Sequence, residues 1–381
     1  MPTDLEDLAP VETRLAQHTT AMRSDVLARL STSRRRRVWP IAALVSGAVA
    51  LLALGSVVVV RDRPVPPALQ AASAQRAYLS QGAFSVGRTV FVGDHRVVFR
   101  DRVRSLLYTS AGVVVHHGRS ASADAAGTSR YSLVSPMGSV RDLDLPLDNQ
   151  LPGTSPSSPL LAYAEPAAAS TWRLVVVDVR TGAQHATTTV DGAYSWAGWV
   201  APPVNIDGDH VRVLLDSGWV EWDMAGDTTR AISRPGLADT PLEAGGGRYV
   251  EQHTGRIDIR DFSDGRTVFG HALADDGDQV TVDHLSPGGQ VVRYDETFTV
   301  YDEHHQLISS PHGGILYDLD RHRRLALGTG PWGWTPDGRA LRVETAKDLV
   351  TTCSALLRSC RTTRRSLPHG TVKLGGVLYG R

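Results

Sequence analysis

The chain has 381 residues, and its 40 basic and 40 acidic side chains give a formal net charge of zero at pH 7. This balance argues against a general nucleic-acid-binding protein, because such proteins carry an excess of basic residues. The length is sufficient for one large domain or two smaller ones, together with terminal segments.

Residues 1–37 form a polar N-terminal segment in which apolar side chains recur at spacings of three and four residues. This spacing predicts one or two amphipathic helices, but the segment is too short to enclose a core. We therefore expect a partly helical cytoplasmic tail. Short inner tails of this kind occur in bacterial membrane proteins, anti-sigma factors among them, so an anti-sigma-like signalling role through this tail is one alternative function.

Residues 38–60 contain no charged side chain and directly follow four consecutive arginines, residues 34–37. An α-helix of this length rises about 34 Å, enough to cross a hydrocarbon layer of about 30 Å. Arginine-rich flanks stay on the cytoplasmic side of a membrane. The sequence therefore predicts a single-pass transmembrane helix, with the lipid bilayer as its partner and the C-terminal part of the chain outside the cell membrane.

Three alternatives for this segment fit less well. A cleaved signal peptide has an apolar core of about 7–15 residues, shorter than the core found here. A twin-arginine signal at residues 33–35 would not be followed by two more arginines and an apolar run that spans a bilayer. A buried core helix would not begin next to four charged side chains.

Residues 61–82 are predicted to be a linker. Pro64, Pro66 and Pro67 keep its first part extended, and residues 68–79 have the composition of a short helix.

Residues 83–381 contain many short segments rich in valine, threonine and aromatic residues, separated by turns such as Asp-Gly and Thr-Gly. Short strands at regular spacing, without helical periodicity between them, indicate an all-β extracytoplasmic domain. A pair of β-sandwiches is the alternative architecture. The predicted strands are residues 89–92, 96–99, 113–115, 131–134, 160–163, 173–177, 211–215, 218–222, 256–259, 297–301, 341–344 and 376–379.

Turns of similar sequence recur at residues 135–138, 286–289 and 334–341. The last reads Trp-Thr-Pro-Asp-Gly-Arg-Ala-Leu and resembles the Trp-Ser-Pro-Asp-Gly-x-x-Leu turn of TolB-type and WD-repeat-like propellers. Residues 176–182, Val-Val-Asp-Val-Arg-Thr-Gly, resemble the hairpin between outer strands of a blade in the same proteins. The resemblance implies a β-propeller of six or seven blades, since each blade takes about 40–50 residues. We expect residues 88–99 to pair with the C-terminal strands around 372–379 and close the ring.

Cys353 and Cys360 are the two cysteines of the chain. Both lie beyond the predicted membrane helix, in a compartment that permits oxidation, and the segment between them suits a short hairpin closed by a disulfide. Such a bond stabilises the fold by about 2.5 kcal/mol in the chain-entropy description. The alternative is a pair of reduced thiols, since two cysteines alone make a poor zinc site.

The remaining motifs predict no catalytic, cofactor or metal site. The Gly-x-Gly-x-x-Gly string at residues 328–333 is followed by a turn and not by the helix that a dinucleotide site needs. The histidine pairs 116–117 and 304–305 would point to opposite faces of a strand. The acidic segments 207–209 and 275–278 are expected to be hairpin turns and not calcium loops.

Trp332 and Trp334 are the candidate binding residues. They would share one face of an extended segment, and exposed aromatic rings stack on sugars and peptides. The alternative for them is packing between blades. The sequence thus favours a membrane-anchored binding, sensing or scaffold module with an extracytoplasmic protein or glycan ligand and no enzymatic activity. A propeller hydrolase or lyase acting on extracellular glycans or peptides is the alternative.

Overall fold

Nearly all of the regular structure beyond residue 82 consists of β-strands. The predicted tail, residues 1–37, and the predicted membrane helix, residues 38–60, lie outside the described residues, which all belong to the unit 64–381. Within the described part of the chain, no helix is both long and apolar enough to cross a membrane. The computed structural model describes residues 66–121, 129–147, 150–195, 200–232, 243–253, 256–272, 285–294, 300–301, 307–308 and 314–377.

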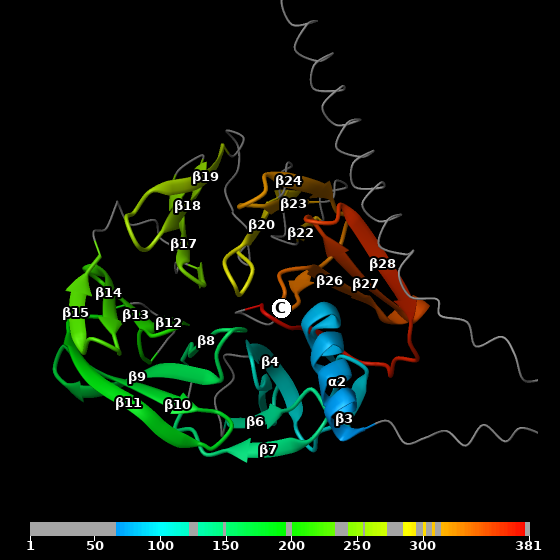
Figure 1. Ribbon diagram of the computed structural model, residues 1–381, viewed down its shortest axis with the longest axis horizontal. Helices are drawn as coiled ribbons and strands as arrows, with labels where there is room; N and C mark the ends of the chain where they lie inside the picture. Colours follow the sequence, from blue (N-terminus) through cyan, green and yellow to red (C-terminus); the bar gives the residue numbers. More distant parts are fainter. Residues whose placement is uncertain are drawn as a thin grey trace, which may run out of the picture. The chain divides into compact units, whose positions relative to one another are not determined.

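The strands of the described residues form seven antiparallel blade sheets and one separate two-stranded hairpin, and the seven sheets are the blades of a β-propeller (Figure 1). Blades 1 and 2 consist of β29 (Val372–Leu374), β1 (Ala83–Val86), β2 (Thr89–Val92) and β3 (His95–Val98), and of β4 (Arg102–Thr109), β5 (Gly112–Gly118), β6 (Arg130–Val134) and β7 (Val140–Leu143). Blades 3 and 4 consist of β8 (Gly153–Thr154), β9 (Leu160–Ala168), β10 (Thr171–Asp178) and β11 (Ala183–Asp191), and of β12 (Val204–Asp207), β13 (His210–Leu215), β14 (Gly218–Asp223) and β15 (Thr228–Ala231).

Blades 5 to 7 complete the set. They consist of β16 (Ala244–Gly245), β17 (Arg248–His253), β18 (Arg256–Asp261) and β19 (Thr267–Ala272); of β20 (Val291–Tyr294), β23 (Ile315–Asp318) and β24 (Arg323–Ala326); and of β25 (Gly333–Trp334), β26 (Ala340–Glu344), β27 (Leu349–Ser354) and β28 (Ser359–Arg364). In blade 6, Leu285 adds a single bridge on the inner side of β20. Between β20 and β23 the chain forms the separate hairpin β21 (Val300–Tyr301) and β22 (Leu307–Ile308), and a 3₁₀ turn, η3 (Thr345–Lys347), precedes β27.

Strand burial depends on the position of the strand within its blade. All seven residues of β5 are buried, because β5 lies inside blade 2 and both of its faces are covered. All six residues of β28, at the outer edge of blade 7, are exposed. Strands covered on both faces read as continuous apolar runs. This is why the sequence predicts buried strands such as β2, whose bounds match the prediction, and misses polar outer strands such as β15.

The ring closes through the pairing of the two ends of the domain. Strand β29 pairs with β1, placing Phe84 opposite Leu374 and Ser85 opposite Lys373. Ring closure by a C-terminal strand is as predicted, but the predicted partner, residues 88–99, forms the outer strands β2 and β3. The predicted strand 376–379 is also wrong in its described part, because the chain turns at Gly376, whose φ is 70°.

Tyr108 connects three blades at this closure. Its hydroxyl oxygen accepts a hydrogen bond of 2.8 Å from the backbone nitrogen of Ala83 in blade 1. The same hydroxyl donates a hydrogen bond of 2.7 Å to the carbonyl oxygen of Trp334 in blade 7. Since Tyr108 is fully buried in blade 2, both backbone groups depend on it for pairing that water cannot supply.

Helix α2 (Pro67–Gln81) occupies most of the predicted linker and belongs to the folded domain. It begins with proline in its first turn, where a missing N–H costs little, and it ends before Gly82, whose φ is 70°. Tyr78 is fully buried against blades 1 and 2, and its hydroxyl lies 2.8 Å from the carbonyl oxygens of Thr109 and Gly112. The helix therefore packs on the turn between β4 and β5.

A candidate binding groove between blades 1 and 7

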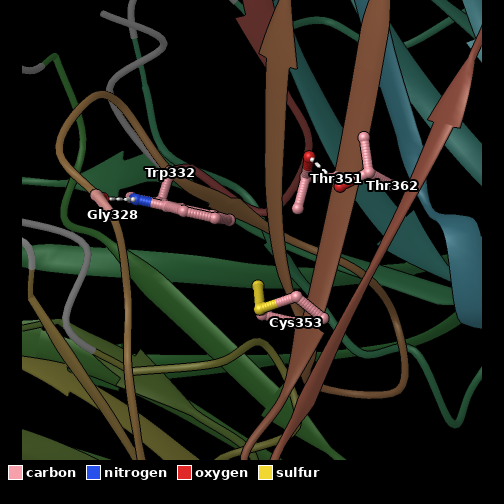
Figure 2. The surroundings of a disulfide bond; sticks show 6 residues. Gly328, Trp332, Thr351, Cys353 and Thr362 are labelled. Carbon is pink, nitrogen blue, oxygen red and sulfur yellow. Dashed lines mark hydrogen bonds between the residues drawn. A yellow bond between two sulfur atoms is a disulfide. The ribbon is translucent and has the colours of Figure 1, made fainter.

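The two tryptophans expected to form a binding surface are buried. Trp332 is 7 % exposed and Trp334 is 0 % exposed, and both pack in the cluster between blades 6 and 7. The indole nitrogen of Trp332 donates a hydrogen bond of 2.8 Å to the carbonyl oxygen of Gly328 (Figure 2). The expected exposed aromatic surface is therefore not found, because the sides of an inner strand are covered by neighbouring blades.

Cys353 and Cys360 face each other across β27 and β28. Their sulfur atoms are 2.07 Å apart, so the pair forms a disulfide at the end of the outer hairpin of blade 7. Figure 2 shows Thr351 and Thr362 further along the same hairpin, with their hydroxyl oxygens 3.0 Å apart. The disulfide and this hydrogen bond link the outermost strand to the buried part of the blade.

A chain of polar side chains crosses blade 2. The Nδ1 atom of His117 lies 3.5 Å from Asp101 Oδ2, and its Nε2 atom lies 2.9 Å from Ser132 Oγ. This order resembles a catalytic triad. The Ser132 hydroxyl, however, donates a hydrogen bond of 2.8 Å to Asp142 Oδ1, and Ser132 is 0 % exposed. Burial lowers the pKa of His117, although Asp101 acts to raise it. The Ser132 hydroxyl is therefore covered by the blade and engaged by Asp142.

A second polar cluster lies inside blade 4. The carboxylate of Glu221 accepts hydrogen bonds of 2.7 Å from the Nε atoms of both Arg212 and Arg230. Although burial acts to raise the pKa of Glu221, the hydrogen bonds and charges of the two arginines hold it below its usual value. The cluster is closed by its own members and offers no free charge to a ligand.

The other sequence motifs occupy turns and strand faces. Residues 328–333 connect β24 to β25 and precede no helix. His116 and His117 contact different partners on opposite sides of β5, Tyr131 and Ser132. Residues 207–209 form the hairpin turn between β12 and β13, whereas the segments 275–278 and 304–305 lie outside the described residues. Within the described residues, no group of three metal-binding side chains is found.

A small cavity of about 50 Å³ lies among the inner strands of blades 2 to 5 and the start of blade 6. Its lining includes Tyr108, Thr154, Asn205 and Glu243. Because one water molecule occupies about 30 Å³ of liquid, this cavity has room for water but is too small for an organic ligand.

A larger groove opens between blades 1 and 7, beside the C-terminal end of α2. Its volume is about 260 Å³, and its walls include Gln81 of α2, Asp94 of the β2–β3 turn, and Thr352 and Thr363 of β27 and β28. We call it the arginine groove after its four arginines, which are Arg339, Arg361, Arg364 and Arg365. Four guanidinium groups and several hydroxyls are therefore among the groups that line it.

Strand alternation explains how blade 7 contributes to this groove. Arg361 and Thr363 are two positions apart on β28, so their side chains share one face of the blade. Across the strand pair, Arg361 lies opposite Thr352. Cys360 directly precedes Arg361 on β28, so its side chain belongs to the other face, where its partner Cys353 packs near Trp332. One hairpin thus places a disulfide toward blade 6 and a polar wall toward blade 1.

Arg365 is held in place by the first blade. Its guanidinium donates a hydrogen bond of 2.7 Å to the carbonyl oxygen of Gly93 and lies over the ring of Phe91, 4.9 Å from the ring centroid. Burial lowers the pKa of Arg365, while the charge of Asp94 acts to raise it. The contact joins the C-terminal end of blade 7 to the turn at the edge of blade 1.

The other three arginines differ in their pairing. Arg339 Nε lies 2.9 Å from Asp337 Oδ2. Burial raises the pKa of Asp337, although Thr335 and Arg339 act to lower it. Arg361 and Arg364 are exposed, and their side chains form no ion pair or hydrogen bond within the part of the chain that the structure describes. The groove thus contains two guanidinium groups with no internal partner.

Sequence reasoning missed this groove. Its signal is the run Arg-Thr-Thr-Arg-Arg at residues 361–365, which alone is typical of an exposed strand edge. The opposite wall is far away in the sequence, since Arg365 and its acceptor Gly93 are 272 positions apart. Only ring closure brings these segments together.

No protein-family profile matches the chain, and no curated protein matches it. Among solved structures, TolB from Acinetobacter baumannii aligns with 13 % identity over 65 % of this chain and 63 % of its own, with a TM-score of 0.39. AztD from Citrobacter koseri aligns with 10 % identity over 76 % of this chain and 96 % of its own, with a TM-score of 0.43.

A third similar structure is the β-propeller domain of Cps50 (Swd1) from Myceliophteria thermophila. It aligns with 12 % identity over 70 % of this chain and 98 % of its own, with a TM-score of 0.37. The alignment with TolB spans less than two thirds of the TolB chain. These distant similarities carry no functional information, and the assignment of a seven-bladed propeller rests on the strand order of the described residues.

Proposed function

We propose that residues 64–381 are a non-enzymatic binding domain held outside the cell membrane by the segment 38–60. The observation that supports this proposal is a contrast between two kinds of polar side chain. Those inside blades 2 and 4 are paired with one another, whereas the side chains of Arg361 and Arg364 in the arginine groove are open to solvent and have no partner among the described residues. Such a groove is suited to recognition, because its charges are available to a ligand.

The topology is tested by adding protease to intact cells that produce the chain. We expect cleavage of most of the polypeptide, leaving a small protected fragment that contains the tail and the membrane segment, residues 1–60. Protection of the large C-terminal part would contradict an extracytoplasmic domain. Lysed cells provide the control, since there the tail should be cleaved as well.

The hydrolase alternative is tested at blade 2, where Ser132 and His117 are hydrogen-bonded. Chromogenic peptide and glycoside substrates are incubated with the purified chain and with the variant Ser132→Ala. We expect no turnover by either protein, because Ser132 is buried and its hydroxyl donates a hydrogen bond to Asp142. Turnover that is lost in the variant would replace a binding function with an enzymatic one.

An anti-sigma-like role of residues 1–37 is a separate proposal that concerns the inner tail. A pull-down with this segment that returns no specific protein would count against it.

A further inference from the structure

We propose that the arginine groove binds a small solute that carries a doubly charged oxyanion, either a phosphate monoester or a dicarboxylate. This inference rests on the proposed binding function and specifies the chemical class of the ligand.

The charge balance of the groove calls for an anion. Four arginines line it, but Asp94 is its one lining carboxylate among the described residues. Asp94 already accepts a hydrogen bond of 3.0 Å from Gln81 Nε2. With Arg361 and Arg364 lacking any described partner, the positive charge of two guanidinium groups is uncompensated, and a dianion would balance it.

The donors are arranged as an oxyanion requires. A guanidinium group presents planar pairs of N–H donors that match carboxylate and phosphate oxygens. Arg361 lies opposite Thr352 across the two strands, with Thr363 two positions along β28, so hydroxyl donors lie beside the guanidinium. Arg365 approaches from the blade 1 side, where its bond to Gly93 fixes its position. An anion in the groove would therefore meet several donors of blade 7, one of which, Arg365, is fixed in position by blade 1.

The size of the groove limits the ligand to a small molecule. Its volume of about 260 Å³ lies just below the range of about 300–1,000 Å³ that is usual for drug-sized ligands. A solute with a few carbon atoms and one or two charged groups fits this space. A folded protein domain does not enter it.

Arg324 is the matched control for Arg361, because it is an exposed arginine that lies outside the arginine groove. It lies on β24, the outer strand of blade 6, and it is exposed. Like that of Arg361, its side chain forms no ion pair or hydrogen bond within the described residues, but it lines neither of the two cavities described above. Changing either arginine to glutamine removes the same charge from an exposed strand.

The test is isothermal titration calorimetry of the full 381-residue chain, purified in detergent, at pH 7 and low salt. Inorganic phosphate and succinate are titrated separately, so that the two arms distinguish a phosphate ligand from a dicarboxylate. We expect saturable binding of at least one probe, and about tenfold weaker binding by Arg361→Gln, since a charge-assisted bidentate pair is lost. The variant Arg324→Gln should bind within about twofold of the natural chain.

Two results would overturn the inference: the absence of saturable heat with both probes, or equal weakening by Arg361→Gln and Arg324→Gln. Thermal melting of each variant shows whether it is folded, and Arg361→Lys offers a second test because it keeps the charge but loses the planar donor pair. Protease accessibility on cells does not depend on these probes. A failed titration with an accessible domain therefore overturns the ligand class alone, whereas a protected domain overturns the proposed location.

Discussion

His116 shows how a single buried side chain sets a pH limit on this fold. Its ring stacks on Tyr131 with the centroids 4.6 Å apart, and its Nε2 atom has no hydrogen-bond partner in the structure. Burial, together with the smaller effects of the charges of Arg104 and His117, lowers the pKa of His116 to about 3. The folded chain therefore keeps this imidazole neutral at pH values where an unfolded histidine is protonated.

We predict that the loss of stability on acidification is smaller in His116→Phe than in the natural chain. The unfolded histidine gains its proton below about pH 6.5, whereas the folded one does so only near pH 3, so stability present above pH 6.5 is lost as the pH falls through this window. The expected difference between pH 6.5 and 5 is about 2 kcal/mol, from about 1.4 kcal/mol per pH unit. Urea unfolding of both proteins at the two pH values measures it, and equal losses would contradict the neutral buried imidazole.

At the scale of elements, the β27–β28 hairpin has two separate roles. One face carries the disulfide next to the cluster of blades 6 and 7, and the other contributes Arg361 and Thr363 to the arginine groove. Because β28 is fully exposed, little apolar burial holds it to the blade. The covalent link therefore supplies a substantial part of what keeps this wall of the groove in position.

We predict that the double variant Cys353→Ser with Cys360→Ser is less stable than the natural chain by about 2.5 kcal/mol, the chain-entropy value for so short a loop. Denaturant unfolding without reductant measures the difference. Reductant should lower the stability of the natural chain by a similar amount and leave the double variant unchanged. If thiol counting on protein purified without reductant finds two free thiols, the link is absent in solution.

At the scale of the whole molecule, ring closure decides stability. Strand β29 supplies the inner strand of blade 1 and covers β1, while Leu374 packs with Phe84, Phe91 and Leu341 from blades 1 and 7. Without β29 the sheet edge of β1 and the faces of two neighbouring blades would be exposed, and an unpaired edge invites aggregation.

We predict that a chain ending at residue 371 loses cooperative thermal unfolding and aggregates, because the ring stays open. Circular dichroism melting and size-exclusion chromatography compare it with the full chain. A synthetic peptide of residues 368–377, added during refolding, should restore the transition by supplying β29. A truncated chain that melts like the full one without the peptide would show that closure contributes little.

Part of this architecture could be predicted from local patterns. Buried strands such as 89–92 appear as apolar runs, and the turn at residues 334–341 resembles propeller turns closely enough to indicate blades. The outer strand β28 is polar on both faces, and β1 is a short segment that mixes Ser85 with apolar residues. Neither has a pattern that distinguishes it from a loop. Because β1 was not recognised as a strand, its pairing with the C-terminal strand in blade 1 could not be assigned.

The sequence by itself determined the all-β class, the propeller type with six or seven blades, and the pairing potential of Cys353 and Cys360, because these depend on neighbouring residues. Only the tertiary structure decided that there are seven blades among the described residues, that Trp332 and Trp334 are buried, and that the arginine groove exists. The physical reason is distance along the chain. The two walls of the groove meet because β29 pairs with β1. No local sequence pattern indicates this contact between segments so far apart in the chain.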